Sequence, residues 1–430
     1  MRVPRAFVDL RPLRESAPFR RLWLGMTASG FGSNVGTFAV VFYVWDRTHN
    51  AAMVGLIGLV TALPLIVFAL LGSAFTDHVD RRRLVRLAMA GQLVTSLLLA
   101  FVAASPGNGV WAMFGLAAVA SGLSAIGTPA IRAFVPRLLP TDRLAAGLAL
   151  NHMSFQVAML FGPIVAGVLA AQWGVAVCFL VDAVTFLAAL AATMALPGGA
   201  PSTTDSRAGA GAVWAGIRLA ARTPPIRGAL LADLTATVLA MPMMLFPVVN
   251  EEKFGGSPEI LGLFTASVAA GGVLASALSG SVTRLGRPGV VLLASGAAWG
   301  TALVGVGLSG HLAVVLGLLA VAGAADTWAV VSRGTVAQAS TPESHRGRVS
   351  ALEHIVGVAG PQLGMLRAGL VAAATSGSVA LVTGGLSCVL GLLLIVLTVP
   401  QLHRFRLPRP APAVDRPPLA EERPAAAQIV

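Results

Sequence analysis

Residues 72–91 read GSAFTDHVDRRRLVRLAMAG and place a compact group of charges between two long apolar runs. Residues 280–296 read GSVTRLGRPGVVLLASG and keep the same order of a Gly-Ser pair, a short basic segment and an apolar run that ends in glycine. Further stretches match at the same separation of about 200 residues, which is typical of an internal repeat. They are VPRLLPTDRLAAGLALN at 135–151 with AQASTPESHRGRVSALE at 337–353, and Gly162-Pro163 with Gly360-Pro361. We therefore expect two similar halves.

The composition excludes a soluble fold for these halves. Of the 430 residues, 56% are hydrophobic and 11% are charged, whereas a soluble domain carries about 25% charged residues. Twelve apolar runs have the length of a membrane helix, which needs about 20 such residues. The sequence predicts an all-α membrane protein with twelve transmembrane helices, at residues 22–45, 53–76, 84–104, 109–131, 145–171, 174–196, 228–249, 260–283, 289–308, 311–332, 349–373 and 378–399.

The polar segments divide the chain into expected domains. The longest polar interruption, residues 197–227, is rich in Pro, Gly, Ser, Thr and Arg and separates six spans from six. The segment before the first span lacks the apolar core and cleavage site of a signal peptide. We expect a cytosolic N-terminal segment at 1–21, a six-helix bundle at 22–196, a cytosolic central loop at 197–227, a second six-helix bundle at 228–399 and a disordered cytosolic tail at 400–430.

The basic residues fall almost entirely on one side of these spans. With the N-terminus in the cytosol, 27 of the 30 lysines and arginines lie in cytosolic segments, including Arg333 after the tenth span. Arg47 and Lys253 lie outside, and Arg367 lies within a span. This bias follows the positive-inside rule, so both termini are expected in the cytosol. The net charge of +12 is then explained by the basic residues that set the orientation in the membrane, and no nucleic-acid partner is expected.

Two parallel six-span repeats are typical of the major facilitator fold, with one bundle for each half. The loop at 73–83 also resembles the signature of that family, G-x-L-a-D-R-x-G-R-K. Asp77 occupies the acidic position and Arg81 and Arg82 the basic pair, whereas both glycine positions differ. The resemblance implies a conformational latch that holds the outward-open state, with the candidate residues Asp77, Asp80, Arg81, Arg82 and Arg132. The alternative is a basic loop that only sets topology.

The fifth predicted span contains a second family-like stretch, GPIVAGVL at 162–169. It is similar to the glycine-proline motif of facilitator antiporters. Gly162 and Gly167 permit close approach of helices, and Pro163 removes a backbone donor and bends its helix. The resemblance implies export rather than uptake.

Four acidic residues fall inside predicted spans, where ionisable groups are costly and commonly functional. The proton-coupling candidates are Asp233, Asp326, Asp182 and Glu353. Facilitator cavities are lined mainly by the first, fourth, seventh and tenth helices, so the resemblance ranks Asp233 and Asp326 first. A carboxyl group in a low-dielectric site could take up and release a proton. The alternative is a satisfied structural acid, which the peripheral sixth helix favours for Asp182.

Other polar residues within spans are candidates for lining a cavity, namely Asn34, His152, Gln156 and Arg367. The first three could equally pack helices together, and Arg367 needs a partner at membrane depth. The histidines lack metal-ligand spacing, and no phosphate-binding loop of the type G-x-x-x-x-G-K occurs. We therefore expect no enzyme, no metal and no cofactor, with the proton gradient as the source of energy.

Across nearly its whole length the chain resembles the enterobactin-exporter branch of the facilitators. The resemblance rests on FRRLWL at 19–24, THNAAMVGL at 48–56, GSAFTDHVDRRRLV at 72–85, SPEILGLFTASVAAGG at 257–272, RPGVVLLAS at 287–295, TPESHRGRV at 341–349 and LHRFR at 402–406. It implies proton-driven export of a siderophore by alternating access, through a monomer in the bacterial inner membrane whose partners are the lipid bilayer and a small-molecule substrate. Related branches export macrolides and other drugs, so a broad-specificity drug/proton antiporter is the alternative. A non-transporting membrane sensor is a third hypothesis.

Overall fold

The computed structural model describes residues 10–76, 80–107, 109–132, 134–194, 210–283, 286–342 and 345–407. Every regular element among them is a helix. The first half contains α1 (Arg11–Glu15), α2 (Ala17–Thr48), α3 (Ala51–Thr76), α4 (Arg81–Ala104), α5 (Val110–Arg132), α6 (Val135–Leu138), α7 (Thr141–Trp173) and α8 (Val175–Met194). The second half contains α9 (Ala210–Arg222), α10 (Pro224–Leu239), η1 (Met243–Leu245), α11 (Phe246–Phe254), α12 (Pro258–Thr283), α13 (Pro288–Leu308), α14 (Leu312–Ala339), α15 (Arg346–Ala374), α16 (Gly377–Thr398) and α17 (Pro400–Arg404).

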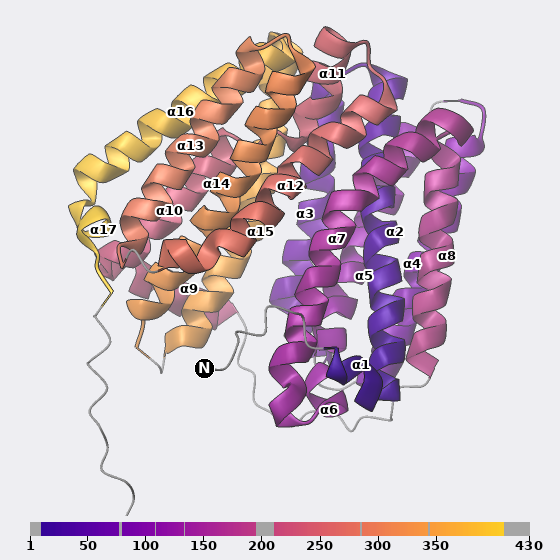
Figure 1. Cartoon of the computed structure of the whole chain (residues 1–430). Coiled ribbons are helices and arrows are strands. Elements are labelled where there is room, and N and C mark those ends of the chain that lie inside the picture. Colours follow the sequence, from indigo (N-terminus) through magenta and orange to yellow (C-terminus); the bar gives the residue numbers. More distant parts are fainter. Residues whose placement is uncertain are drawn as a thin grey trace, which may run out of the picture.

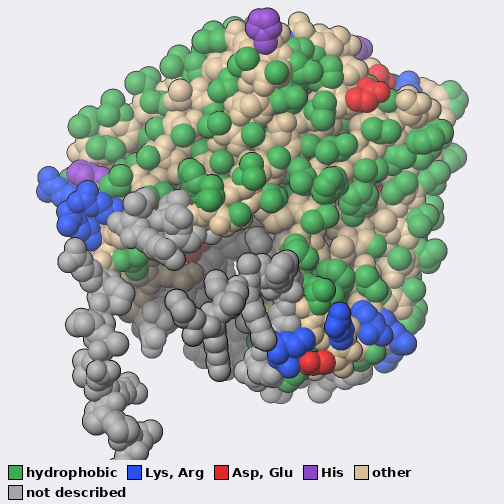
Figure 2. All heavy atoms as spheres, in the orientation of Figure 1, with side chains coloured by type: hydrophobic (Ala, Val, Ile, Leu, Met, Phe, Trp, Pro, Cys, Tyr) green, Lys and Arg blue, Asp and Glu red, His purple; other side chains and the backbone are tan. Residues whose placement is uncertain are grey.

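The long helices of the two halves stand side by side (Figure 1). Short helices mark the two ends of this assembly: α1, α6 and α9 lie at one end and α11 lies at the other. We call these ends the α1 side and the α11 side. Lysine and arginine side chains gather along the α1 side, and Figure 2 shows the surface hollowed between the two halves toward that side.

The surface around the long helices is apolar. Ten helical segments in the described part of the chain are long and apolar enough to cross a membrane. The other two expected spans lie in α2 and α15, which have 32 and 29 residues. Side chains such as Phe101, Trp111 and Leu397 are exposed on this surface, and Figure 2 shows apolar side chains spread over its face. Lipid tails cover such a surface without the cost of contact with water. The fold is an all-α, multi-pass membrane fold.

Equivalent glycines pack equivalent helices in the two halves. Gly162 of α7 faces Asn34 of α2, where an added Cβ atom would contact the asparagine side chain. Gly360 of α15 faces Thr237 of α10 in the same way. Both glycines belong to the Gly-Pro pairs that mark the sequence repeat. The repeat is therefore visible in the packing as well as in the sequence.

The seventh expected span, residues 228–249, is not one continuous helix. The structure ends α10 at Leu239 and resumes helical structure at η1 and α11. Pro242 lies in the break, where it cannot donate the backbone hydrogen bond of a regular helix. Two side chains satisfy carbonyl groups released there: Arg367 donates to the Leu239 carbonyl, and Trp299 donates to the Ala240 carbonyl at 2.9 Å.

Three segments expected as loop or tail contain helices. In the N-terminal segment, α1 covers Arg11–Glu15 and α2 begins at Ala17. The expected central loop contains α9, and α10 begins before that loop was expected to end. In the expected disordered tail, α17 buries Leu402 completely, and the Leu407 amide donates to the Gly286 carbonyl at 3.0 Å. These corrections share one cause, because apolar side chains in polar segments dock on the bundles. The rest of the tail lies outside the described residues.

The two halves meet along two pairs of helices near the α11 side. In the first pair α3 packs on α15, where Gly55 and Gly369 bring the two backbones together. In the second pair α7 packs on α12, where an added Cβ atom at Gly262 would lie 2.6 Å from the Pro163 carbonyl oxygen. All four glycine and proline positions lie in the parts of these helices nearest the α11 side. The structure is therefore closed on the α11 side.

Helix α11 adds a polar contact between the halves on this side. The Trp45 indole donates to Glu251 Oε2 at 2.6 Å, and His49 Nδ1 lies 3.3 Å from the same oxygen. The next two residues bind within their own half. Glu252 accepts from the backbone amide of Gly377 at 2.7 Å, and Lys253 donates to the carbonyls that end α13.

We expect Lys253→Met to destabilise the second half. Lys253 Nζ donates to the carbonyls of Val306, Gly307 and Ser309 at 3.0, 2.7 and 2.9 Å. Hydrogen bonds to a charged group contribute about 1.5–3 kcal/mol, so a clear fall in the thermal midpoint in detergent is expected. Arg287→Met is the control, because the Arg287 side chain is exposed. An unchanged midpoint for Lys253→Met contradicts the cap.

Candidate functional site

A buried ion pair lies in the second half between α10 and α14. Arg333 Nη1 of α14 contacts Asp233 Oδ1 of α10. The Asp233 side chain is 12% exposed and the Arg333 side chain is 13% exposed. Asp233 Oδ2 and Arg333 Nε have no hydrogen-bond partner among the described residues. The pair therefore has unused capacity to bind a proton, water or a polar ligand.

Arg333 was expected in a cytosolic loop, and the structure corrects this. Helix α14 continues to Ala339, beyond the predicted end of the tenth span at residue 332. Arg333 follows Asp326 by seven residues, which is two turns on one helix face. That spacing between an acid and an arginine was the sequence signal for their shared face.

Two further acids join this pair into what we call the acidic cluster, consisting of Asp233, Asp326, Arg333 and Glu353. Asp326 has an exposed side chain and lies within electrostatic reach of both Asp233 and Arg333. Glu353 of α15 is half-buried and also interacts with both members of the pair. The cluster lies toward the α1 side, since Glu353 is at the start of the third turn of α15 and Asp233 is in the third turn of α10.

The remaining acidic candidate, Asp182, lies apart from the cluster in the first half. It is 6% exposed, and Ser96 of α4 donates to its Oδ2 at 2.6 Å. Three of the four acids selected from the sequence therefore lie together, and one does not.

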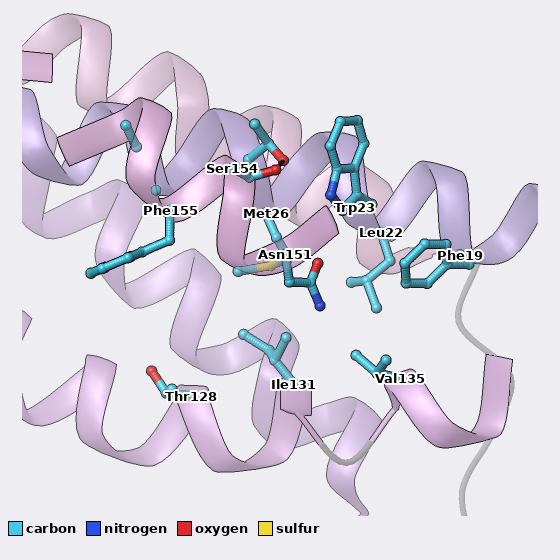
Figure 3. Close-up of a pocket in the computed structure, with 13 residues that line it drawn as sticks. Phe19, Leu22, Trp23, Met26, Thr128, Ile131, Val135, Asn151, Ser154 and Phe155 are labelled. Atoms are coloured by element: carbon cyan, nitrogen blue, oxygen red, sulfur yellow. Dashed lines mark hydrogen bonds between the residues drawn. The ribbon is translucent and has the colours of Figure 1, made fainter. Parts of the chain in front are cut away.

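A mainly apolar pocket of about 260 Å³ lies in the first half toward the α1 side. Figure 3 shows side chains from α2, α5, α6 and α7 around it, with the Asn151 amide pointing into the space between Ile131 and Leu22. The Trp23 indole nitrogen, which also lines the pocket, is buried without a hydrogen-bond partner in the described structure. The lining combines aromatic and aliphatic groups with a few polar atoms, as small-molecule sites commonly do. Its residues are Phe19, Leu22, Trp23, Met26, Thr27, Gly30, Thr128, Ile131, Val135, Asn151, Ser154, Phe155 and Ala158.

None of the cavity candidates whose side chains the structure describes lines this pocket. Asn34 donates to the Gly30 carbonyl of its own helix at 2.8 Å and packs against Gly162. Gln156 belongs to a different face of α7 from the lining residues, and the His152 side chain lies outside the described residues. Arg367 stabilises the break after α10. The sequence did not indicate Trp23 or Asn151, because apolar and amide side chains in a membrane helix carry no distinctive pattern.

Only part of the expected latch can be placed. Asp80 is the N-cap of α4 and accepts from the Arg82 amide at 2.9 Å. The Arg82 side chain donates to the Met194 carbonyl at the end of α8, also at 2.9 Å. Both contacts stay within the first half. Asp77 and the side chains of Arg81 and Arg132 lie outside the described residues.

The glycine-proline stretch of α7 lies at two helix contacts. Gly162 faces α2, whereas Gly167 faces the backbone of α12 at Pro258 in the other half. The Pro163 carbonyl oxygen is the atom that Gly262 of α12 approaches. The stretch therefore contributes to the closed contact between the halves.

A comparison with known protein families matches residues 8–422 to the family described as transmembrane secretion effector. The chain belongs to this family. It is a family of major facilitator transporters, which move solutes across membranes and are not enzymes. A transporter of this kind requires a small-molecule substrate and a membrane.

Curated relatives match over nearly their whole length. The enterobactin exporter EntS of Citrobacter koseri is 26% identical over 409 residues, which covers 94% of this chain and 97% of the relative. The enterobactin exporter EntS of Shigella boydii is 25% identical over 403 residues, with 93% and 96% covered.

Solved structures show the same fold at low sequence identity. A bacterial homologue of the lysosomal transporter Spinster, in an inward-facing and unoccupied conformation, matches with a TM-score of 0.70 at 17% identity, covering 93% of this chain and all of that one. A bacterial homologue of the iron transporter ferroportin, also inward-facing, matches with a TM-score of 0.69 at 16% identity, with 89% and 98% covered. The twelve-helix facilitator fold is therefore established for this chain.

Proposed function

We propose that this transporter exports a siderophore of the enterobactin type from the cytosol, in exchange for protons, by alternating access. The observation that carries the proposal is the buried Asp233–Arg333 pair, with Asp326 and Glu353 in reach on the α1 side. A buried pair of this kind has two stable arrangements. Asp233 is either charged and bound to Arg333, or protonated and released from it.

The acidic cluster contains three acids and one arginine, so its net charge is negative when all four groups are ionised. Such a cluster attracts protons. Protonation of one acid lowers the negative charge, and loss of that proton restores the attraction for Arg333. A substrate that arrives from the α1 side can thus exchange with a proton held in the cluster.

The orientation of the protein in the membrane belongs to the same proposal. Arginines gather on the α1 side (Figure 2), and cytosolic segments of membrane proteins are rich in Lys and Arg. The α1 side is then cytosolic, both termini are cytosolic and the α11 side is external. We further propose a monomer in a bacterial inner membrane, where the two bundles of one chain provide both halves of the transport cycle.

The apolar pocket is the proposed substrate site. Trp23 and Phe155 can stack on an aromatic ring, and Asn151 can hydrogen-bond to ring substituents. An aromatic compound with hydroxyl groups, as in a catecholate siderophore, fits this combination. The relatives that match over the whole chain are described as enterobactin exporters, which supports the same class.

Deletion of the gene in its native bacterium is the direct test. We expect the native siderophore to fall in the medium and to rise in the cytosol, with recovery by a plasmid that carries the wild-type gene. Unchanged secretion in the deletion strain contradicts siderophore export.

A broad-specificity drug/proton antiporter is the second candidate, and the composition of the pocket favours it specifically. The described lining residues include no charged side chain, so the pocket can accept apolar compounds of several shapes. Altered susceptibility of the deletion strain to unrelated hydrophobic antibiotics, together with normal siderophore secretion, would support this candidate.

We expect Trp23→Ala to weaken substrate binding by about twofold to tenfold, since an aromatic contact contributes about 0.5–1.5 kcal/mol. The measurement is the substrate concentration for half-maximal transport in membrane vesicles. Trp173→Ala is the matched control, because Trp173 is exposed at the end of α7 on the α11 side. Equal effects of both variants contradict the assignment of the pocket.

A further inference from the structure

A second cavity, of about 310 Å³, lies inside the first half around Asp182. It is distinct from the apolar pocket, and it lies in the other half from the acidic cluster. Helices α2, α3, α4, α5 and α8 line it, and α15 of the second half contributes one residue, Gln362. A cavity of this size with polar groups in its lining has room for several water molecules, each of which takes about 30 Å³.

The carboxyl group of Asp182 is seated between α2 and α4. Ser96 donates to Oδ2, whereas Oδ1 is buried without a hydrogen-bond partner in the described structure. On the α2 side the group lies against Gly32 and Gly36, where added Cβ atoms would lie 2.9 Å from Oδ1 and 3.1 Å from Oδ2. The two glycines therefore leave the space that the carboxyl group occupies.

The polar groups around the cavity leave acceptor atoms free. The Thr37 hydroxyl donates to the Ser33 carbonyl at 2.7 Å. The Ser121 hydroxyl donates to the Thr61 carbonyl at 2.5 Å. The Gln92 side-chain amide donates to the Ala120 carbonyl at 3.1 Å. The remaining oxygen lone pairs suit a proton-bearing guest such as water or hydronium.

Asp182 is the one titratable residue among the described residues that line the cavity. Helix α2 contributes Ser33, Gly36, Thr37 and Val40, helix α4 contributes Gln92, Ser96 and Leu99, and α3, α5 and α15 contribute hydroxyl, amide and apolar groups. None of the described lining residues belongs to α7. Among the described lining residues, the Asp182 carboxyl is therefore the group that can take up or release a proton in this cavity.

The cavity reaches the contact between the halves. Gln362 Oε1 of α15 lies 3.5 Å from Thr61 Oγ1 of α3, close to where Gly58 of α3 meets the Gln362 backbone. This contact belongs to the α3–α15 pair that closes the α11 side. Thr37 and Ser124 of its lining are already exposed, so the cavity is not sealed. Separation of the halves on the α11 side would remove Gln362 from the cavity and open it toward that side as well.

We propose that Asp182 is a second proton-binding site, which is loaded from the α11 side when the halves separate and is closed off from that side when Gln362 returns. This role rests on the proposed proton-coupled function. The neutral acid packs against Gly32 and Gly36 without a charge to hydrate, whereas the carboxylate needs water and favours the open cavity. Because α2 also holds Trp45 and Trp23, its packing on Asp182 links the external contact to the substrate pocket.

The test measures closure of the α11 side without any substrate. Spin labels are placed at Gln172→Cys and His311→Cys, which are exposed positions on the α11 side, one in each half. The native Cys178 and Cys388 are buried. The distance between the labels is measured in purified protein in lipid nanodiscs, from mildly alkaline to mildly acidic pH. In the labelled parent protein the short distance is expected to become dominant as the pH falls.

Asp182→Asn imitates the protonated acid, so we expect the short distance at every pH and loss of the pH response. Ser96→Ala removes the donor to the charged form, so the midpoint of the response is expected at higher pH. Ser124→Ala, which changes the cavity lining without touching the carboxyl group, is the matched control and should leave the response unchanged. His49→Gln removes the titratable group at the Glu251 contact and should also keep it.

A normal pH response in Asp182→Asn overturns the proposal, as does loss of the response in His49→Gln. If Asp182→Asn does not fold, an unchanged midpoint in Ser96→Ala overturns it. These readings are distinguishable from failure of the proposed function, because siderophore secretion is tested in cells and the label distance needs no transported compound. A structural role alone for Asp182 predicts lower thermal stability in the variant and an unaltered pH response.

Discussion

Replacing Asp233 with asparagine is expected to abolish the proposed proton-driven export while the protein stays folded. The amide keeps the size of the side chain and can still accept a hydrogen bond from Arg333, but it cannot carry a proton through the cycle. Loss of a proton-transfer group commonly costs two or more powers of ten in rate, so we expect proton-linked transport to fall on the order of 100-fold. The measurement is substrate-induced collapse of a pH gradient in everted membrane vesicles.

The control for this experiment is Asp46→Asn, because Asp46 is an exposed acid near the α11 side and outside the cluster. It should retain normal coupling. The variant Arg333→Ala tests the other half of the pair, since it leaves the Asp233 carboxylate buried without its partner. Breaking a buried pair in this way costs about 3–5 kcal/mol. The double variant Asp233→Asn with Arg333→Gln should recover stability without recovering coupling. Normal coupling in Asp233→Asn excludes Asp233 as the proton carrier.

The second large effect is expected at Gly262, where α12 approaches α7. A leucine there would place its Cβ atom 2.6 Å from the Pro163 carbonyl oxygen, which is a backbone atom and cannot rotate away. Gly262→Leu should therefore prevent closure of the α11 side and reduce transport to background. The labels at Gln172→Cys and His311→Cys should report a longer distance than in the labelled parent protein.

Gly115→Leu is the matched control for this substitution. Gly115 lies in α5, and an added Cβ atom there meets no atom within 4 Å. The control should transport normally and keep the parental label distance. Closure of the α11 side in Gly262→Leu contradicts the close backbone approach described for α7 and α12.

The membrane fold was predictable from the sequence because its signals are long and redundant. Each apolar run extends for several helical turns, and the repeat supplies a second copy of each feature. The break after α10 was not predictable in the same way. Met241 and Met243 flank Pro242 in an apolar stretch, so the hydropathy profile shows no interruption at the break. The helix ends there because Arg367 and Trp299 supply donors from other helices, and such partners are set by tertiary packing.

Only those residues of the candidate site that are charged and lie inside apolar predicted spans could be predicted from the sequence. Asp233, Asp326 and Glu353 stand out in apolar spans, and the structure places them together. Arg333 did not stand out, because an arginine near a predicted helix end resembles a topology signal. For Asp182 the family resemblance favoured a structural role, because the sixth helix is peripheral in the family. Its cavity depends on Gly32 and Gly36 of another helix, and glycines in a membrane segment do not indicate which side chain they accommodate.

The contact at Glu251 has a consequence for the symmetry of the molecule. His49 and Glu251 are separated by about the repeat length of 200 residues, so they occupy comparable positions at the ends of the first and seventh spans. Two identical halves around a two-fold axis would bring each such residue against its own copy. An acid would then face an acid on the α11 side. The pairing of His49 with Glu251 is available only to halves that differ, so the duplicated chain can close its α11 side with a contact that a symmetric dimer of one half could not form.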